Sequence, residues 1–359
     1  MNDIRAAAEP WFRDTQQSVG RSEEAMGRQE ATRRENLIRL LDLTRRRGPL
    51  AQVELARETG LRPSTVSYLA RTLREAGVVT ETGRGASGPA GGKRSVYLAI
   101  DPGFGCFTGA LLRGRELITA MVDFAGTAHQ WQRETLSDQS PEALYRRFEK
   151  AARSHGETAR KLGSGYLGLG AAVSSVVDKE GAVHSSAAFP YVLEELPKRL
   201  EAAASSAGAE NPAVVVENDA NCTALYHHQR TSEPPGSVVS LVFARDPVSV
   251  GAGLILSGAL YRGRSGGAGE ILPADFGEDP EEMDRLAAAA VRVTDPEVVV
   301  LAAEEGDRAL LPGEYPRLYR ELRSREVVRV SNPEASVLGA AYLAYEKSLR
   351  SLVLPRSAS

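Results

Sequence analysis

A carboxylate follows an apolar run in the segment VVVENDANCTAL, which covers residues 214–225. Asp219 stands there between the side-chain amides of Asn218 and Asn221. An α/β enzyme can use a carboxylate at the end of a buried strand as a general base, beside amides that bind substrate. Asn and Asp also begin helices, because they accept hydrogen bonds from free backbone N–H groups. The segment therefore predicts either a catalytic or ligand-binding carboxylate or a helix cap.

The part of the chain that must position this carboxylate, residues 101–350, alternates apolar runs with amphipathic stretches. Such alternation is typical of an α/β fold. We expect strands at 109–112, 117–124, 166–178, 213–219, 238–243, 250–256 and 297–303, and helices at 144–162 and 192–208. Two hairpin-containing groups of strands are separated by helices, a pattern that allows a two-fold duplication.

The preceding segment has a different pattern, with three short helices expected at residues 35–47, 52–59 and 63–76. Their inward positions are occupied by Leu37, Ile38, Leu40, Leu41 and Leu43, then Val53, Leu55 and Ala56, then Val66, Leu69, Leu73 and Ala76. Two strand-like runs, VVTET and SVYLAI, follow and bracket the Gly-rich loop GRGASGPAGGKR. Three helices and a two-stranded wing predict a winged helix-turn-helix.

The third of these helices has the residue types that read DNA. Slim hydrogen-bonding side chains at its start suit the major groove, and arginines around them suit phosphates. The candidate DNA-binding residues are Arg62, Ser64, Thr65, Ser67, Tyr68 and Arg71 on or beside the helix, with Arg84, Lys93 and Arg94 at the wing. Residues 31–97 carry 13 basic and 6 acidic side chains, a net charge of +7, whereas the rest of the chain has a net charge of −10. A basic segment on an acidic body favours an anionic partner for that segment. The alternative is a helical bundle with a solvated basic face.

Composition limits the remaining function classes. The 359 residues are 42% hydrophobic and 25% charged, which is ordinary for a globular protein. We expect no membrane span, no signal peptide and therefore a cytoplasmic protein. Cys106 and Cys222 lack the spacing of a disulfide framework or a metal site, and the adjacent His227 and His228 cannot both face one metal on a helix, so no metal is expected. The expected parts are a flexible arm (1–32), the winged helix-turn-helix (33–100), the α/β body (101–350) and a tail (351–359).

The order of motifs along residues 33–346 resembles the ROK family of bacterial sugar-responsive repressors and sugar kinases. The winged helix precedes IDPGFG, ENDAN, VGAGLIL and GALYRGRSGGAGEI. The resemblance implies a two-lobed actin- and hexokinase-like, ribonuclease H-like body. It also implies that a member with an N-terminal winged helix regulates transcription.

The phosphate-binding motifs of the family's kinases are altered in this chain. The segment Leu111–Arg115, LLRGR, stands where the kinases have a DxGxT motif, so the carboxylate that organises magnesium is a leucine. Asp246 and Pro247 stand at the start of the second phosphate loop. In the third element, Ala302-Ala303 followed by Glu304 stands where the kinases have a Gly-Gly pair near the nucleotide. An acid repels phosphate and proline lacks an amide donor. We expect no catalytic residue, no cofactor and no enzyme activity.

Half of the family's sugar site is retained. The resemblance assigns the general base to Asp219 and hydroxyl-binding roles to Asn218 and Glu270. A histidine is replaced by Pro273, an asparagine before Leu-Pro is absent, and the family's zinc cluster is missing. Asn218, Asp219 and Glu270 are therefore candidate ligand-binding residues, with helix capping as the alternative for the Asx pair and a satisfied acid for Glu270.

The leading hypothesis is a dimeric DNA-binding transcription regulator, more specifically a repressor, with a double-stranded DNA operator and a sugar or sugar-derived effector as partners. A homodimer or a dimer of dimers would bind a two-half-site operator. Two alternatives stay open. One is a sugar kinase with an appended DNA-binding domain, and the other is an effector-blind regulator whose body only dimerises.

Overall fold

The computed structural model describes residues 31–84, 96–184, 192–245, 248–271, 279–303 and 312–351. The chain divides into two compact units at the boundary between Ala99 and Ile100. Each unit has buried apolar side chains of its own.

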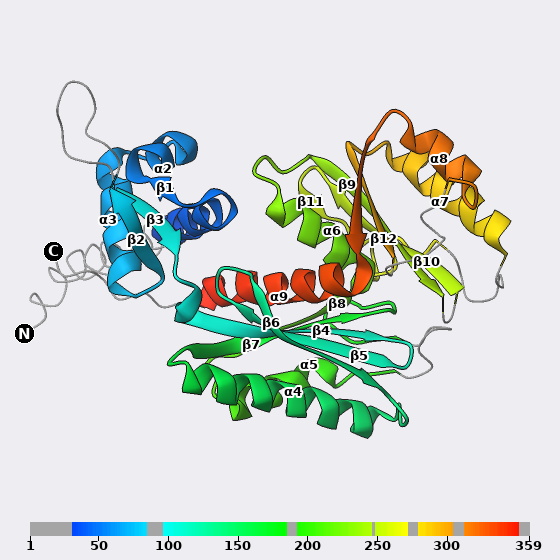
Figure 1. Ribbon diagram of the computed structural model, residues 1–359, viewed down its shortest axis with the longest axis horizontal. Helices are drawn as coiled ribbons and strands as arrows, with labels where there is room; N and C mark the ends of the chain where they lie inside the picture. Colours follow the sequence, from blue (N-terminus) through cyan, green and yellow to red (C-terminus); the bar gives the residue numbers. More distant parts are fainter. Residues whose placement is uncertain are drawn as a thin grey trace, which may run out of the picture. The chain divides into compact units, whose positions relative to one another are not determined.

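The N-terminal unit is a winged helix-turn-helix, as predicted. A helix covers residues 31–47, followed by β1 (Leu50–Ala51), α2 (Gln52–Thr59), α3 (Pro63–Glu75), β2 (Val79–Arg84) and β3 (Val96–Ile100). The strands form a small sheet in the order β1-β3-β2 (Figure 1). Gly60, with φ of 69°, ends α2 in the left-handed conformation that makes the tight turn before α3.

The core of this unit follows most of the helical periodicity of the sequence, although Ile38, Leu43 and Ala76 are only half-buried. Leu40, Leu55 and Leu73 are fully buried, and Leu37, Leu41, Ala56, Val66 and Leu69 are buried beside them. Val53 was expected to point inward and is 67% exposed, so that prediction was wrong. The inward face of α2 is set by Leu55, Ala56 and Thr59, and Val53 lies two positions from Leu55, on the opposite side of the helix.

The second unit contains two five-stranded sheets with the same topology. The first has the order β6-β5-β4-β7-β8 and the second β11-β10-β9-β12-β13. In each, three antiparallel strands are followed by two parallel ones. The strands are β4 (Gly105–Arg113), β5 (Glu116–Asp123), β6 (Ala128–Thr135), β7 (Gly165–Val173), β8 (Ala213–Asn218), β9 (Ser237–Arg245), β10 (Val248–Leu256), β11 (Ala259–Leu260), β12 (Val298–Ala303) and β13 (Glu326–Ser331). The two-fold duplication is confirmed.

Helices cover both sheets in the same way. Figure 1 shows α4 (Pro141–Lys161) and α5 (Leu196–Ser206) on one face of the first sheet, with α9 (Asn332–Ser351) along the other. For the second sheet, α7 (Pro280–Thr294) and α8 (Pro316–Leu322) lie on one face and α6 (Asp219–Arg230) on the other (Figure 1). Gly170 of β7 lets α9 approach closely, because a Cβ atom there would lie 1.9 Å from the Ala340 carbonyl oxygen.

In this unit one predicted strand ends earlier than expected, and one predicted helix begins later than expected. The strand expected over 166–178 ends at Val173, where the chain turns into the loop that carries Ser174 and Ser175. The helix expected over 192–208 begins at Leu196, because Pro197 lies in its first turn, where a missing N–H group costs no hydrogen bond.

No helix among the described residues is both long and apolar enough to cross a membrane. Nor do three or more His, Cys, Asp or Glu side chains of the described ranges gather where they could hold a metal ion. Cys106 and Cys222 are buried free thiols, and burial raises the pKa of Cys106 to about 12.

Candidate functional site

The outer face of α3 carries most of the predicted DNA-binding residues. Arg62 occupies the N-cap position, and Pro63 opens the helix with the backbone conformation that a first turn needs. Ser64, Ser67 and Arg71 are exposed, one turn apart, whereas Val66 and Leu69 point into the core. Thr65 is half-buried beside this stripe. The helix therefore presents hydroxyl groups and cations on one surface.

Tyr68 is less accessible than its sequence position suggests. It is half-buried, and the guanidinium groups of Arg33 and Arg71 lie 5.9 Å and 6.0 Å from the centre of its ring. Cations over an aromatic face are attracted by its quadrupole. Tyr68 thus holds two arginines near α3, and one of them, Arg33, comes from the helix over 31–47 and was not predicted as a site residue.

Another residue of this face was missed by sequence reasoning. Gln52, the first residue of α2, accepts a hydrogen bond from the hydroxyl of Ser67 through Oε1, at 3.0 Å. The residues are fifteen positions apart, so only the turn between the two helices brings them together. No periodicity or motif in the sequence indicates that contact.

The wing residues are placed only in part. Arg84 ends β2, and its side chain is not among the described atoms. Lys93 and Arg94 lie outside the described residues. Their roles stay a prediction.

The ENDAN segment joins β8 to α6, and its asparagine caps the helix. The Asn218 Oδ1 accepts hydrogen bonds from the backbone N–H groups of Ala220 and Asn221, at 2.9 Å and 3.1 Å. Its Nδ2 group donates to the carbonyl oxygen of Ser175 at 3.2 Å. The Oδ1 and one N–H of this side chain are thereby used inside the protein. For Asn218, helix capping is the role that the contacts support.

Asp219 has a different environment from that of its neighbour. Its carboxylate is buried and accepts a hydrogen bond from the hydroxyl of Ser174, at the end of β7. Burial raises the pKa of Asp219, while the Ser174 bond and the positive charge of Arg113 act in the opposite direction. An acid that is costly to bury and has one side-chain donor is typical of a ligand-binding or catalytic position.

Glu270 is close enough to Asp219 for the charges of the two carboxylates to interact. Desolvation and then the charge of Asp219 raise the pKa of Glu270, although the side chain stays accessible to solvent. The loop before Glu270 passes close to the backbone of β10 at Gly269. Gly269 has a φ of 92°, and a Cβ atom there would lie 1.8 Å from the Ala252 carbonyl oxygen, so the position requires glycine. Glu270 forms a β-bridge with Gly251, where a Cβ atom would lie 3.7 Å from the Ala220 Cβ. The backbone of Glu270 therefore lies near the start of α6, which carries Asp219.

Glu217 links the ENDAN segment to Arg262, which follows β11. This buried carboxylate accepts hydrogen bonds from the backbone N–H of Asn218 at 2.9 Å and from the side chain of Asn221 at 3.0 Å. Arg262, which follows β11 in the other lobe, pairs with it at 2.6 Å. Sequence reasoning did not single out this pair, although it ties ENDAN to the second lobe.

The positions of the kinase phosphate motifs are occupied by ordinary sheet structure. Leu111 and Leu112 are buried in β4, and Gly114 makes the hairpin turn to β5. Ala302 and Ala303 are buried at the end of β12. Asp246, Pro247, Pro273 and Glu304 lie outside the described residues.

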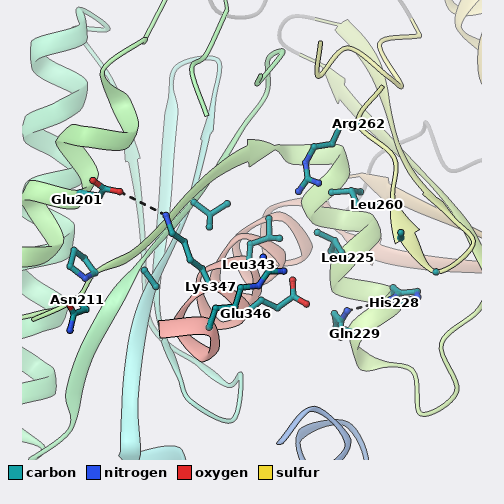
Figure 2. Close-up of a pocket in the computed structure, with 16 residues that line it drawn as sticks. Glu201, Asn211, Leu225, His228, Gln229, Leu260, Arg262, Leu343, Glu346 and Lys347 are labelled. Atoms are coloured by element: carbon teal, nitrogen blue, oxygen red, sulfur yellow. Dashed lines mark hydrogen bonds and ion pairs between the residues drawn. The ribbon is translucent and has the colours of Figure 1, made fainter. Parts of the chain in front are cut away.

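A groove lies at the far end of α6 from Asp219. Its volume is about 1050 Å³, and its walls come from β8, β11, α6 and α9. Figure 2 shows Leu225, Leu260 and Leu343 on its surface together with charged side chains. The Lys347 ammonium group lies 4.0 Å from Glu201 and donates to the carbonyl oxygen of Val214 at 2.9 Å, which covers part of the exposed edge of β8. His228, expected at a surface or lobe interface, is buried against this groove.

The different surroundings of Asn218 and Asp219 predict opposite effects on stability. Asn218→Ala should lower the free energy of unfolding by about 1 kcal/mol, because two N–H groups of α6 lose their acceptor. Asp219→Asn should raise the free energy of unfolding at pH 7. The raised pKa means that the folded protein holds the charged form at a cost, and the amide removes that cost. Urea denaturation at pH 7 measures the free energy of unfolding of both variants. Equal losses of stability in the two variants would show that both residues only cap the helix.

Comparison with known proteins identifies the N-terminal unit. The family model of the IclR helix-turn-helix domain matches residues 35–83. Over 239 residues the chain is 24% identical to the xylose repressor of Staphylococcus xylosus, a match that covers 66% of this chain and 59% of that protein. The xylose repressor of Bacillus subtilis is 25% identical over 223 residues, which are 62% of this chain and 56% of the relative. The chain thus matches less than two thirds of the length of these relatives.

Solved structures share the fold of the chain. A ROK family transcriptional regulator, a homolog of the E. coli MLC protein, superposes with a TM-score of 0.67 at 15% identity, covering 89% of this chain and 98% of that one. A ROK family glucokinase from Streptomyces griseus, in complex with glucose and AMPPNP, gives 0.54 at 18% identity and covers 67% of this chain and 100% of the glucokinase. The chain is similar to xylose repressors, and it joins a segment that matches the IclR helix-turn-helix model to a body with the fold of ROK proteins of known structure.

Proposed function

We propose that the protein is a transcription regulator, and specifically a repressor, that binds double-stranded DNA through α3 and its wing. The observation that carries the proposal is the exposed face of α3, where Ser64, Ser67 and Arg71 lie in line on a helix-turn-helix. Hydroxyl groups and arginines on such a helix suit base edges and phosphates. The names of the similar xylose repressors support repression rather than activation of transcription. Such a regulator acts in the cytoplasm, where its operator is.

A kinase with an appended DNA-binding unit is the second candidate, and the body argues against it. Phosphoryl transfer needs groups that hold the phosphates and magnesium opposite the general base. Leu111 and Leu112 are buried in β4 where the resemblance places the first of these groups, and Ala302 and Ala303 are buried where it places another. Asp219 would then lack a phosphoryl donor, so we propose no enzyme activity.

We further propose that the protein acts as a homodimer or a dimer of dimers. Operators of helix-turn-helix proteins are read as two half-sites, and two-fold protein symmetry matches a palindrome. Two copies of one winged helix also double the number of phosphate contacts, which raises affinity at physiological salt.

For the effector, we propose a hydroxyl-rich sugar or sugar derivative between Asp219 and Glu270. The carboxyl oxygens of Asp219 and of Glu270, whose backbone lies near the start of α6, can accept hydrogen bonds from sugar hydroxyls. The names of the xylose repressors make xylose the first sugar to test. Such an effector would change DNA binding only through its different affinity for two arrangements of the body.

Thermal denaturation with xylose and other monosaccharides tests this site. An effector present at 100 times its Kd should add about 2.7 kcal/mol to the free energy of unfolding. Glu270→Gln should abolish the stabilisation. If no sugar stabilises the protein while operator binding is unchanged, the body is effector-blind and serves only for dimerisation.

Genomic immunoprecipitation tests the regulatory function itself. We expect enrichment of a few discrete sites that share a two-half-site sequence and lie upstream of genes. A flat genomic profile from protein that is folded and expressed would contradict the proposal.

A further inference from the structure

The hydrogen bond between Gln52 and Ser67 fixes the chemistry that these side chains can offer to a ligand. Gln52 begins α2, and Ser67 lies on the exposed face of α3. The Ser67 hydroxyl donates to the Gln52 Oε1 at 3.0 Å. The hydrogen of the serine and one acceptor site of the amide are therefore already used.

The pair can still offer a ligand a hydrogen-bond donor on Gln52 and a hydrogen-bond acceptor on Ser67, which lie side by side. A serine hydroxyl that donates its hydrogen still has lone pairs on Oγ, so Ser67 can only accept from a further partner. The Gln52 Nε2 group keeps its two N–H donors. The pair thus presents a donor from α2 next to an acceptor from α3, both held by their mutual bond.

Among single bases in the major groove, adenine alone carries the matching pattern. Its N7 accepts a hydrogen bond and its N6 amino group donates one, whereas guanine offers two acceptors, thymine an acceptor and a methyl group, and cytosine one donor. We propose that Gln52 and Ser67 together read an adenine, with the Gln52 Nε2 donating to N7 and the Ser67 Oγ accepting from N6. This inference rests on the proposed function, because it assumes that α3 enters the major groove.

The neighbouring residues support this orientation. Ser64 and Arg71 lie on the same exposed stripe of α3, one turn before and one turn after Ser67. Tyr68 is half-buried under the guanidinium groups of Arg33 and Arg71, so it leaves the outermost position to Ser67. A hydrogen bond formed before binding also lowers the entropy that must be lost when DNA arrives.

The experiment first selects operators for the full chain from random duplex DNA. Wild-type protein should enrich an adenine at one position of each half-site. Gln52→Ala and Ser67→Ala should each weaken the preference for adenine at that position, because each variant keeps one of the two contacts, and should leave the other positions unchanged. Gln52→Glu, which keeps the acceptor but has no donor, should also lose the adenine. Gln132→Ala, at an exposed glutamine of β6 in the body, is the matched control and should retain the wild-type sequence preference.

The selected operator then identifies the atoms by base analogues. With 7-deazaadenine, which lacks N7, wild-type affinity should fall by about 3- to 10-fold, and with purine, which lacks the N6 amino group, by a similar factor. Gln52→Ala should be insensitive to 7-deazaadenine and still sensitive to purine. Ser67→Ala should show the reverse.

The outcomes separate this inference from the function on which it rests. If wild-type protein selects no sequence, the proposed function fails. If wild-type protein selects an operator while both alanine variants keep every base preference, the adenine assignment fails. A preference for a cytosine–guanine pair at the affected position would also overturn the adenine assignment. The donor of Gln52 and the acceptor of Ser67 would then contact two different bases of one pair.

Discussion

Reversing two charges on the recognition helix, with Arg62→Glu and Arg71→Glu together, is expected to lower the affinity for all duplex DNA by about 100-fold per winged helix at about 0.15 M salt. Both side chains are exposed at α3, where they can approach phosphates. Each phosphate contact releases counterions, so its loss weakens specific and random binding alike. The slope of log affinity against log salt should become shallower by about two per copy. Fluorescence anisotropy titrations at several salt concentrations measure both quantities.

The control for this prediction keeps the same change in net charge and moves it to the body. Arg153→Glu with Arg160→Glu changes two exposed arginines of α4. DNA affinity should fall far less in this variant, because the charges are not on the winged helix. Equal losses in the two variants would mean that overall charge, and not contact by α3, governs binding.

Acidification should destabilise the body through His155. This histidine is fully buried, and desolvation lowers its pKa to about 4 from an ordinary value of 6.5. The unfolded chain therefore binds a proton between pH 6.5 and pH 4 that the folded chain does not, so stability falls as the pH falls through this range. The loss should reach about 3 kcal/mol at pH 4. Urea denaturation from pH 7 to pH 4 measures it.

His155→Leu should remove this contribution to the pH dependence. The Nδ1 of His155 lies 2.9 Å from the Thr108 Oγ1, which also lies 2.8 Å from the Tyr166 hydroxyl, so Thr108 keeps a partner in the variant. If His155→Leu and wild-type protein lose stability in parallel below pH 6.5, buried His155 does not cause the loss.

Sequence patterns predicted the elements that apolar periodicity defines. The winged helix, the hairpin β4–β5 and the strand before ENDAN were all recognisable, because burial of one face imposes a period on the sequence. Strand β6 was not predicted, because it is an edge strand with mostly exposed polar side chains and therefore no apolar alternation. Strand β1 has two residues, which is too short for any pattern.

The site was predictable only where a motif carried it. Asp219 was recognised as a carboxylate after an apolar run, and its assignment with Asn218 and Glu270 to one site came from the family resemblance. The fold places the backbone of Glu270 near the start of α6. Gln52 and Arg262 were missed, because their partners Ser67 and Glu217 are fifteen and forty-five positions away and nothing local marks the pairs. The structure also separates the two neighbouring residues of ENDAN, because Asn218 caps α6 whereas Asp219 is a buried acid that accepts a hydrogen bond from Ser174.

The central claim is that this chain reads a DNA sequence, and the ratio of two affinities tests it most directly. The full chain is titrated at about 0.15 M salt with its selected duplex and with a shuffled duplex of the same composition and length. The account predicts that the selected duplex binds at least about 1000-fold more tightly. Equal affinities for the two duplexes would contradict it.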